Sequence, residues 1–419
     1  MDACLTGDEW RTHDIDALVD GDSDALLSIV AEGLADRFNP RLDDIYADIF
    51  SYAIARVDNR HTAAELRSRY RHLRTIRPYA PFVEPSEVMR ERILQVEEKA
   101  LRTLRTGGAA YHVPGIVPHP PHEDQPDPER IVLLSRVTLG ADIAVTSIVA
   151  QALQSRFPDS HIELAGNRKS AELLGLPLLP VDYPRTGGLR ARLEAAAPIR
   201  ALDEKTLVID PDSRLTQLGV YPVTDELRYY FFDSRGIARA GSLSSLARDW
   251  CAQVFEVDIP WPRIQPGDPP FSFTRPAITV SFGVGGNESK RVGEEFERRL
   301  LRELSSRAAT VIVDKGAGEE EAQRAESAAA GLTNVKFWNG SFAVFAALIA
   351  NSDLYVGYDS AGQHAAAALG IPLVSVFAGA VSDRFFERWR PDGRVIRIDN
   401  GSPESAFIRV RSALPALGP

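Results

Sequence analysis

The strongest constraint on the fold is an alternation of short apolar runs with longer segments whose apolar residues recur at helical spacing. Between residues 277 and 377 the apolar runs are AITVSFGV, ATVIVDK, NVKFW, DLYVGY and LVSVF, and the helical patterns include SKRVGEEFERRLLREL and AGQHAAAALG. Parallel strands need a long crossover connection, which is usually a helix, so this alternation favours a parallel sheet. The sequence therefore predicts an α/β fold.

The same alternation appears earlier in the chain. IVLLSRV, which starts at residue 131, is followed by the helical pattern IAVTSIVAQALQSRF and then by HIELAG and TLVIDPDSR, which again end in polar residues. A proline-rich run over residues 259–276 separates the two stretches and suits a hinge. We therefore expect two Rossmann-like lobes with parallel sheets, one over residues 131–258 and one over residues 277–419.

The first quarter of the chain has a different pattern. Residues 1–105 carry helical periodicity with no interrupting strand pattern, which predicts an all-helical extension. Residues 106–130 contain glycines, prolines and histidines, a composition typical of an extended linker. We prefer this linker to a metal site formed by His112, His119 and His122, because no neighbouring element fixes the ligand geometry. We expect no metal and no other cofactor.

Composition narrows the class of partner. The 419 residues carry a formal net charge of −10, which argues against nucleic acid as the main partner, because binding to its backbone needs a dense cationic surface. Two cysteines are too few for a disulfide framework, so a reducing compartment is expected. No apolar run approaches the length of a membrane span. We expect a cytoplasmic protein, and attachment to the inner face of the membrane stays open.

The sharpest local signal is the segment DLYVGYDSAGQHAAAALGIPLVSVF. A strand runs into Asp359, Ser360, Ala361 and Gly362, and a helix of small residues begins there. The free N–H groups at the start of such a helix attract an anion such as a diphosphate, and His364 in the first turn can donate a hydrogen bond to it. The alternative is a tightly packed turn without a ligand.

The second signal is the strand and loop AITVSFGVGGNESKR, in which glycines precede Lys290 and Arg291. A lysine here can neutralise the charge that develops on a leaving phosphate. An ordinary surface lysine is the alternative.

The third signal is LSRVTLGADIAVTSIV, where Asp142 follows a strand and a glycine turn. A carboxylate at this place can act as a general base toward an acceptor hydroxyl, or can simply cap the following helix. In VIDPDSR, Asp210 and Arg214 lie at the end of another strand and are candidates for acceptor contact. A strand-end turn explains them equally well.

Together these segments resemble the heptosyltransferases of glycosyltransferase family nine, over residues from about 130 to 415. The layout of LGADIAVTSIVAQALQSRFP resembles the family's catalytic segment and implies that Asp142 is the base. SFGVGGNESKR implies that Lys290 is the phosphate-contacting lysine. The family's D-[ST]-G-x-x-H-x-A-A-A-L segment resembles the run from Asp359 to Leu369.

This resemblance implies a GT-B fold, in which two lobes face each other across a cleft, with the acceptor on the N-terminal side and the donor on the C-terminal side. It implies inverting, metal-independent transfer from a nucleotide diphosphate sugar, with ADP-heptose favoured. The carboxylate that contacts the donor ribose falls in DKGAGEEEAQRA, where we select Glu320 over Glu319 and Glu321.

The sequence departs from the family pattern at two places. Ala141 intervenes between Gly140 and Asp142, whereas the family has glycine directly before the aspartate. Ala361 stands where the family has glycine, and Gly362 follows one place later. Both departures affect the expected turn geometry, the second at the diphosphate site. The family does not ordinarily carry a helical extension like residues 1–105.

Two other functions compete with this reading. GVGG after a strand resembles half of a dinucleotide fingerprint, but the full G-x-G-x-x-G of an NAD-linked oxidoreductase is missing. The second alternative is an inactive GT-B scaffold that uses its helical extension for protein interaction or self-association. The acceptor stays open among a glycan, a protein and a small molecule, because acceptors change freely on one fold.

Overall fold

The computed structural model describes residues 126–183, 195–203, 205–213, 215, 228–232, 234, 240–259, 261–285, 288–316, 318–379, 383–398 and 402–417. Within these residues the chain forms two compact units. The first unit lies within residues 126–137, 157–167 and 177–239, and the second within residues 138–156, 168–176 and 240–417. The predicted helical extension over residues 1–105 and nearly all of the linker over residues 106–130 lie outside the described residues.

The first unit is built on a parallel sheet. In its described residues the strand order is β3-β2-β1-β4-β5, and each neighbouring pair is parallel. The strands are β1 (Arg130–Leu134), β2 (His161–Gly166), β3 (Leu178–Pro180), β4 (Leu207–Asp210) and β5 (Tyr229–Phe231), with the short helix α11 (Ala197–Arg200) between β3 and β4. Apolar residues such as Val132, Leu134 and Val208 form a buried core.

The second unit contains a larger parallel sheet. Among the described residues its strand order is β11-β10-β9-β6-β7-β8, and every pairing is parallel. The strands are β6 (Ala277–Ser281), β7 (Thr310–Asp314), β8 (Val335–Trp338), β9 (Leu354–Tyr358), β10 (Leu373–Ala378) and β11 (Arg394–Ile398). Strands β6, β9 and β10 are buried along their whole length, as expected where helices cover both faces.

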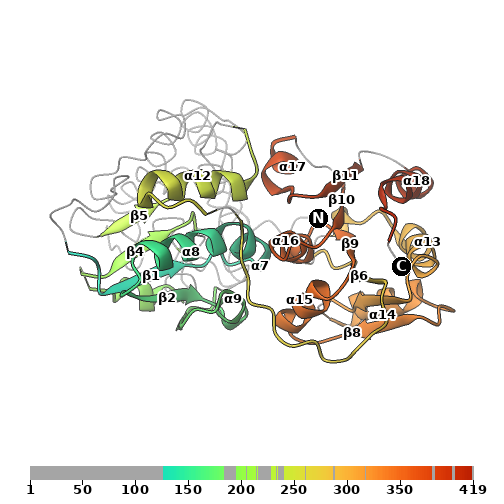
Figure 1. The fold of residues 1–419 in the computed structure, drawn as a ribbon, viewed down its shortest axis with the longest axis horizontal. Helices are drawn as coiled ribbons and strands as arrows, with labels where there is room; N and C mark the ends of the chain where they lie inside the picture. The colour runs from blue at the N-terminus through green and yellow to red at the C-terminus, as the bar shows by residue number, and fades with distance from the viewer. Residues whose placement is uncertain are drawn as a thin grey trace, which may run out of the picture. The chain divides into compact units, whose positions relative to one another are not determined.

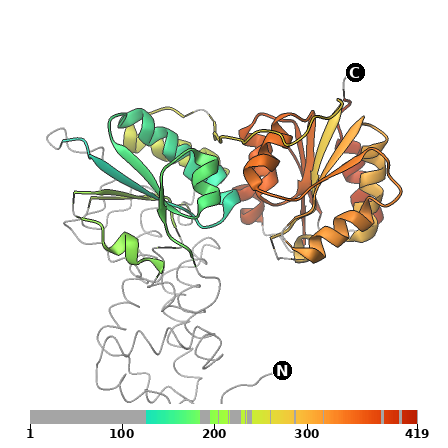
Figure 2. The same ribbon diagram turned by 90° about the horizontal axis from the view of Figure 1, so that it is seen from below.

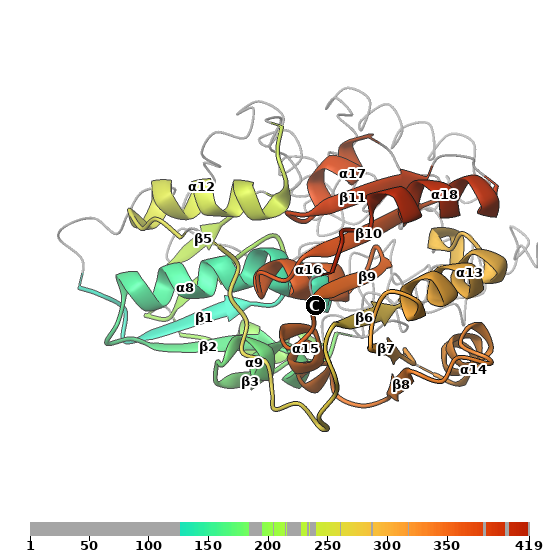
Figure 3. The same ribbon diagram turned by 45° about the vertical axis from the view of Figure 1, so that its right-hand side comes forward.

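Helices flank this second sheet on both faces (Figures 1, 2 and 3). Helices α13 (Glu294–Ser305), α14 (Glu319–Ala328) and α18 (Pro403–Ala413) contribute to one buried core with β6, β7 and β9. Helices α15 (Phe342–Ala350) and α16 (Ala361–Ala368) lie on the other face. Helix α17 (Asp383–Trp389) follows β10.

The second unit also includes a segment that follows β1 in the sequence. It consists of α7 (Leu139–Ala141), a π-helical turn η2 (Asp142–Thr146) and α8 (Ser147–Arg156). Helices α9 (Arg168–Leu174) and α12 (Leu243–Phe255) belong to the same unit, and α12 packs along α8. A single π turn accommodates one extra residue in a helix and is often found at functional sites.

The two parallel sheets confirm the predicted α/β class. All five apolar runs predicted between residues 277 and 377 form strands. The predicted helix over SKRVGEEFERRLLREL begins later, at Glu294, because Gly293 precedes it with a φ of 137°, which is not helical. The domain boundaries and the GT-B arrangement of the two lobes across a cleft stay predictions.

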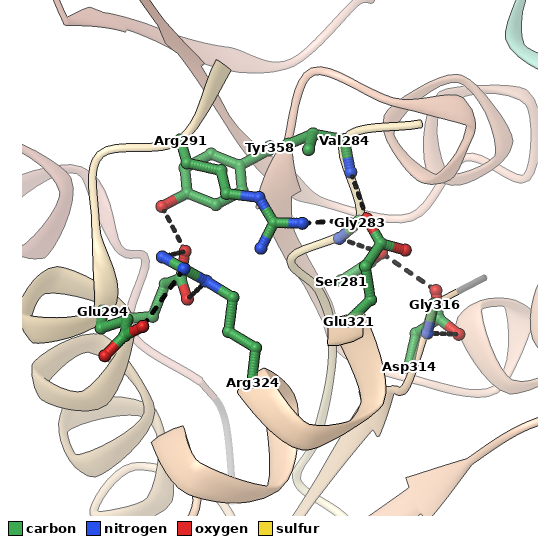
Figure 4. A network of polar contacts seen from close by, with 11 residues as sticks. Ser281, Gly283, Val284, Arg291, Glu294, Asp314, Gly316, Glu321, Arg324 and Tyr358 are labelled. Atoms are coloured by element: carbon green, nitrogen blue, oxygen red, sulfur yellow. Dashed lines mark hydrogen bonds and ion pairs between the residues drawn. The ribbon is translucent and has the colours of Figure 1, made fainter. Parts of the chain in front are cut away.

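A buried ion pair joins helices α13 and α14 to strand β9 (Figure 4). Glu297 is completely buried, and it accepts hydrogen bonds from Arg324 Nε at 2.7 Å and from Tyr358 Oη at 2.9 Å. Burial, together with the charge of Glu297, raises the pKa of Tyr358 above its ordinary value, so its hydroxyl stays a donor. Removing one partner of a buried ion pair leaves an uncompensated charge and lowers the stability of the folded protein.

We expect Arg324→Met to lower the free energy of unfolding by about 3 kcal/mol, because it leaves the buried carboxylate of Glu297 without its cation. Chemical denaturation measures this change. The control is Arg298→Met, which removes an exposed ion pair with Glu295 and should cost less than about 0.5 kcal/mol. Equal losses in the two variants would show that burial does not decide the strength of the Glu297 pair.

Candidate functional site

The functional candidates of the second unit gather at the carboxyl edge of its sheet. Strand β6 lies between β7 and β9, and the three strands end at Ser281, Asp314 and Tyr358. Because parallel strands all end at the same edge, the loops that follow them meet there, and ligands of such sheets bind at this edge. The predicted residues Lys290 and Asp359 lie in two of these loops.

Lys290 and Asp359 form an ion pair across this edge. Lys290 ends the 3₁₀ turn η4 (Glu288–Lys290) after β6, and its Nζ donates to Asp359 Oδ2 at 2.7 Å and to the Asp359 carbonyl oxygen at 3.3 Å. The lysine side chain is 25% exposed and the aspartate side chain 7%. The lysine is therefore held in place yet accessible, so a bound anion can compete with Asp359 for it.

Helix α16 begins directly after this pair. Ser360 is its N-cap residue, but the side chain of Ser360 makes no capping bond. By contrast, Ser341 and Ser402 each accept a hydrogen bond from the first turn of α15 and α18, respectively. The first-turn N–H groups of α16 point toward the sheet edge that carries Lys290, and they add the positive end of the helix dipole.

A network of buried side chains supports Asp359 from behind. Gln363 Nε2 donates to Asp359 Oδ1 at 2.6 Å, and the hydroxyl of Ser375 on β10 donates to Gln363 Oε1. Gln363 Nε2 also lies 3.3 Å from His364 Nε2 and 3.5 Å from the carbonyl oxygen of Trp389. His364 carries no charge near neutral pH.

Burial lowers the pKa of His364 to about 4, with Asp359 partly opposing this change and Lys290 adding to it. The ring is 6% exposed and packs edge-on against Trp389 with 6.0 Å between centroids. The sequence predicted His364 as a phosphate donor. Near neutral pH any such contact would come from an uncharged imidazole.

The displaced glycine of the family segment has a packing reason. A Cβ atom at Gly362 would overlap the hydroxyl of Tyr355, and a Cβ at Gly357 would meet the same hydroxyl. Tyr355 is completely buried in β9, and burial raises the pKa of its phenol. Its hydroxyl lies near Ser281 and Ser360 but forms no well-aligned hydrogen bond. Tyr355 thus fills the space that a side chain at Gly362 would need.

A second polar cluster lies at the β6 and β7 ends (Figure 4). Arg291 Nη2 donates to Glu321 Oε1 at 3.1 Å, and the same oxygen accepts from the backbone N–H of Val284 at 3.2 Å. Ser281 donates to Asp314 at 3.0 Å. Burial, with a contribution from Glu321, raises the pKa of Asp314 despite two hydrogen bonds that lower it.

The selected carboxylate, Glu320, is exposed in the first turn of α14, whereas its neighbour Glu321 points into the cluster with Arg291. Sequence reasoning missed this difference, because three consecutive glutamates give no sign of which one faces the sheet edge. The available signal for a buried carboxylate in this segment was a second cation, Arg291, directly after Lys290 in the sequence. In the structure Arg291 is 9% exposed and pairs with Glu321.

Asp142 lies inside a helix and does not cap one. The N-cap of α7 is Thr138, and Asp142 opens the π turn, so the predicted capping alternative is wrong. Its carboxylate accepts hydrogen bonds from Thr146 Oγ1 at 2.8 Å and from Ser170 Oγ at 2.6 Å. The side chain is buried, with 1% exposed.

The segment of Asp142 packs against the first turn of α16 within the second unit. A Cβ at Gly140 would lie 3.2 Å from His364 Cδ2 and 3.4 Å from Ala361 Cα, so glycine permits this close approach. Before α7, Val137 has a φ of 75°, which is a strained conformation for a β-branched residue. Such conformations persist mainly at functional sites.

Of the two acceptor candidates, only Asp210 lies among the described residues. Asp210 is completely buried in the first unit, where it accepts from the backbone N–H of Ser213 at 2.6 Å and from the hydroxyl of Tyr229. These bonds support the strand-end turn that was the alternative explanation. Arg214 lies outside the described residues.

The described part of the chain lacks two other kinds of site. None of its helices has the length and apolar character needed to cross a bilayer. Across the described ranges, no group of three or more His, Cys, Asp and Glu side chains is arranged to hold a metal.

A parallel sheet whose carboxyl edge carries a lysine beside a helix N-terminus defines a Rossmann-type domain suited to a phosphorylated ligand. Residues 239–408 match the model of glycosyltransferase family 9, described as heptosyltransferase. Residues 239–408 thus form a domain of this family, and the chain is a glycosyltransferase, as the sequence resemblance predicted. The matched range contains Lys290 and Asp359 but not Asp142.

Solved structures give further similarities. Heptosyltransferase WaaC of E. coli with ADP has a TM-score of 0.49 and 15% identity, covering 68% of this chain and 100% of that one. ADP-heptose heptosyltransferase II of E. coli has a TM-score of 0.48 and 18% identity, covering 68% and 98%. A family 9 glycosyltransferase of Veillonella parvula has a TM-score of 0.47 and 15% identity, covering 68% and 97%. No curated protein matches the chain in sequence.

The buried His364 predicts a dependence of stability on pH. Its pKa falls from 6.5 to about 4 on folding, so below pH 6.5 the unfolded chain binds a proton that the folded chain does not. The free energy of unfolding should therefore fall as the pH falls through this window, by about 1 kcal/mol between pH 7 and pH 5.5.

Denaturation of wild type and His364→Gln at both pH values measures this effect, and the variant should lose it. His161→Gln, which changes an exposed histidine at the start of β2, is the control and should keep it. An unchanged pH dependence in His364→Gln would contradict the assignment.

Proposed function

We propose that this protein transfers a sugar from a nucleotide diphosphate donor to an acceptor hydroxyl, with inversion and without a metal ion. The observation that carries the proposal is the Lys290–Asp359 pair at the N-terminus of α16. The family description supports a heptose as the sugar, and the sequence resemblance favours ADP-heptose. The acceptor is a glycan, a protein or a small molecule.

In this proposal the donor diphosphate binds between Lys290 and the first turn of α16. The bond between the anomeric carbon and the phosphate oxygen breaks, and the diphosphate leaves with its additional negative charge. A positioned cation and free N–H groups stabilise this charge most when it develops, so they lower the barrier. Lys290 and α16 can supply this stabilisation without a metal.

The base in this proposal is Asp142. It takes the proton from the acceptor hydroxyl while the hydroxyl oxygen forms the new bond to the anomeric carbon. Thr146 and Ser170 orient the carboxylate by donating one hydrogen bond to each oxygen. A carboxylate oxygen has more than one lone pair, so it can also accept a hydrogen bond from the acceptor hydroxyl.

One observation favours the second candidate, an inactive scaffold. Asp142 is 1% exposed and already holds two hydroxyl groups, an arrangement that a structural aspartate also adopts. In this alternative residues 1–105 serve protein interaction or self-association. Production of a nucleotide diphosphate from a nucleotide sugar, with or without an added acceptor, separates the two candidates.

Residues 131–258 would form the acceptor lobe and residues 277–419 the donor lobe, with residues 259–276 as the hinge. The donor ribose would contact a carboxylate at the start of α14, either Glu320 as selected from the sequence or Glu321 in its polar cluster. A cytoplasmic location, with or without attachment to the inner membrane face, suits a nucleotide sugar donor.

We expect Lys290→Ala to weaken binding of ADP and of ADP-heptose by about tenfold or more, because a hydrogen bond to a charged group contributes roughly 1.5–3 kcal/mol. Isothermal titration calorimetry measures both affinities. His364→Ala should have a smaller effect, since His364 is neutral. Lys336→Ala removes the same charge from an exposed lysine on β8 and is the control. Equal affinities in Lys290→Ala and the control would refute the phosphate assignment.

We expect Asp142→Asn to reduce transfer by at least about a hundredfold, because it removes the general base. ADP-heptose affinity and melting temperature should change little. Asp353→Asn, which removes a carboxylate paired with Arg275, is the control and should leave transfer unchanged. Transfer by Asp142→Asn at the wild-type rate would assign Asp142 a structural role only.

A further inference from the structure

Helix α17 carries an exposed aromatic ring that the proposed reaction does not yet use. Phe385 is 37% exposed and is one of four exposed large apolar side chains in the described residues of this unit. It lies in the second unit, seven residues after the end of β10. Burial of such a side chain is favourable, so its exposure beside a ligand site calls for a reason.

The rest of α17 is anchored, which fixes the position of Phe385. Phe386 packs edge-on against Phe377 of β10 with 5.2 Å between ring centroids. Glu387 accepts from the backbone N–H of Gly241 at 3.1 Å, and Arg388 donates to the Gly241 carbonyl oxygen at 3.2 Å. Asp383 pairs with Arg397 of β11. Phe385 is thus presented on a helix that neighbouring elements hold.

Phe385 contacts Lys290, one of the residues proposed to bind the diphosphate. Lys290 Nζ lies 5.7 Å from the centroid of its ring, within the range of a cation–π contact. The ring centroids of Phe385 and Trp389 are 6.2 Å apart, and those of Trp389 and His364 are 6.0 Å apart. A row of aromatic rings therefore runs from the first turn of α16 to the lysine.

The strand order separates this row from the polar cluster of Arg291 and Glu321. That cluster lies at the ends of β6 and β7, the Lys290–Asp359 pair lies between β6 and β9, and α17 follows β10. A nucleotide diphosphate sugar has its diphosphate in the middle. With the diphosphate on Lys290 and the ribose toward β7, the sugar points toward β10 and α17.

We propose that Phe385, backed by Trp389, is the platform against which the sugar ring of the donor packs, and that it selects nucleotide sugars over free nucleotide diphosphates. This inference rests on the proposed function. A sugar ring has faces lined with C–H groups, which pack against a flat apolar ring, while its hydroxyls stay available for polar contacts. Phe385 acts on donor binding and not on the transfer chemistry itself.

The test measures the affinities of ADP and of ADP-heptose for wild type and variants by isothermal titration calorimetry. Phe385→Leu should weaken ADP-heptose binding about fivefold while ADP binding stays unchanged, because an aliphatic side chain of similar size lacks the flat ring. Phe385→Tyr keeps the ring and should bind like wild type. Phe337→Ala is the control, since Phe337 is 38% exposed and also faces a lysine, Lys315, at 5.8 Å.

The outcomes separate this inference from the proposed function. If wild type binds ADP-heptose more tightly than ADP and Phe385→Leu keeps that preference, the platform is refuted and the donor site stands. If Phe385→Leu weakens ADP and ADP-heptose equally, the ring contacts the nucleotide part and the sugar assignment is wrong. If wild type binds neither ADP nor ADP-heptose, the proposed function itself fails, and the platform fails with it.

Discussion

The central position of β6 determines where the candidate site residues of this protein meet. β6 pairs in parallel with β7 on one side and with β9 on the other, so the loops that follow these strands leave the sheet at one edge. Lys290 comes from the loop after β6 and Asp359 from the end of β9, 69 residues later in the sequence. Their ion pair exists only because the sheet brings the two loops together.

Contacts between buried residues then fix the positions of the side chains at this edge of the sheet. Tyr355 occupies the space beside Gly362, Gly140 lets α7 approach Ala361 and His364, and Gln363 joins Asp359 to β10. Burial also keeps His364 uncharged near neutral pH. The positive charge available to a phosphate therefore comes from Lys290 and from the backbone of α16, and this combination favours a ligand with several negative charges.

Much of the second unit could be predicted from residue patterns, because apolar runs and helical periodicity are local properties. The five strands and the separate signals at Lys290 and Asp359 are of this kind. Other features depend on neighbours that are distant in the sequence. The choice between Glu320 and Glu321 depends on which residues of α14 face the sheet edge, and the position of Phe385 depends on the packing of α17.

Residue patterns alone indicate the alternating α/β arrangement, the family segment from Asp359 to Leu369 and the cation at Lys290, because each is carried by residues close together in the chain. Three other features became visible in the folded chain. Asp142 lies in a π turn and accepts a hydrogen bond from Ser170. Tyr355 requires a glycine at position 362, and Phe385 lies beside Lys290. Each of these features depends on contacts between side chains of separate elements, so it cannot be predicted from a local sequence pattern.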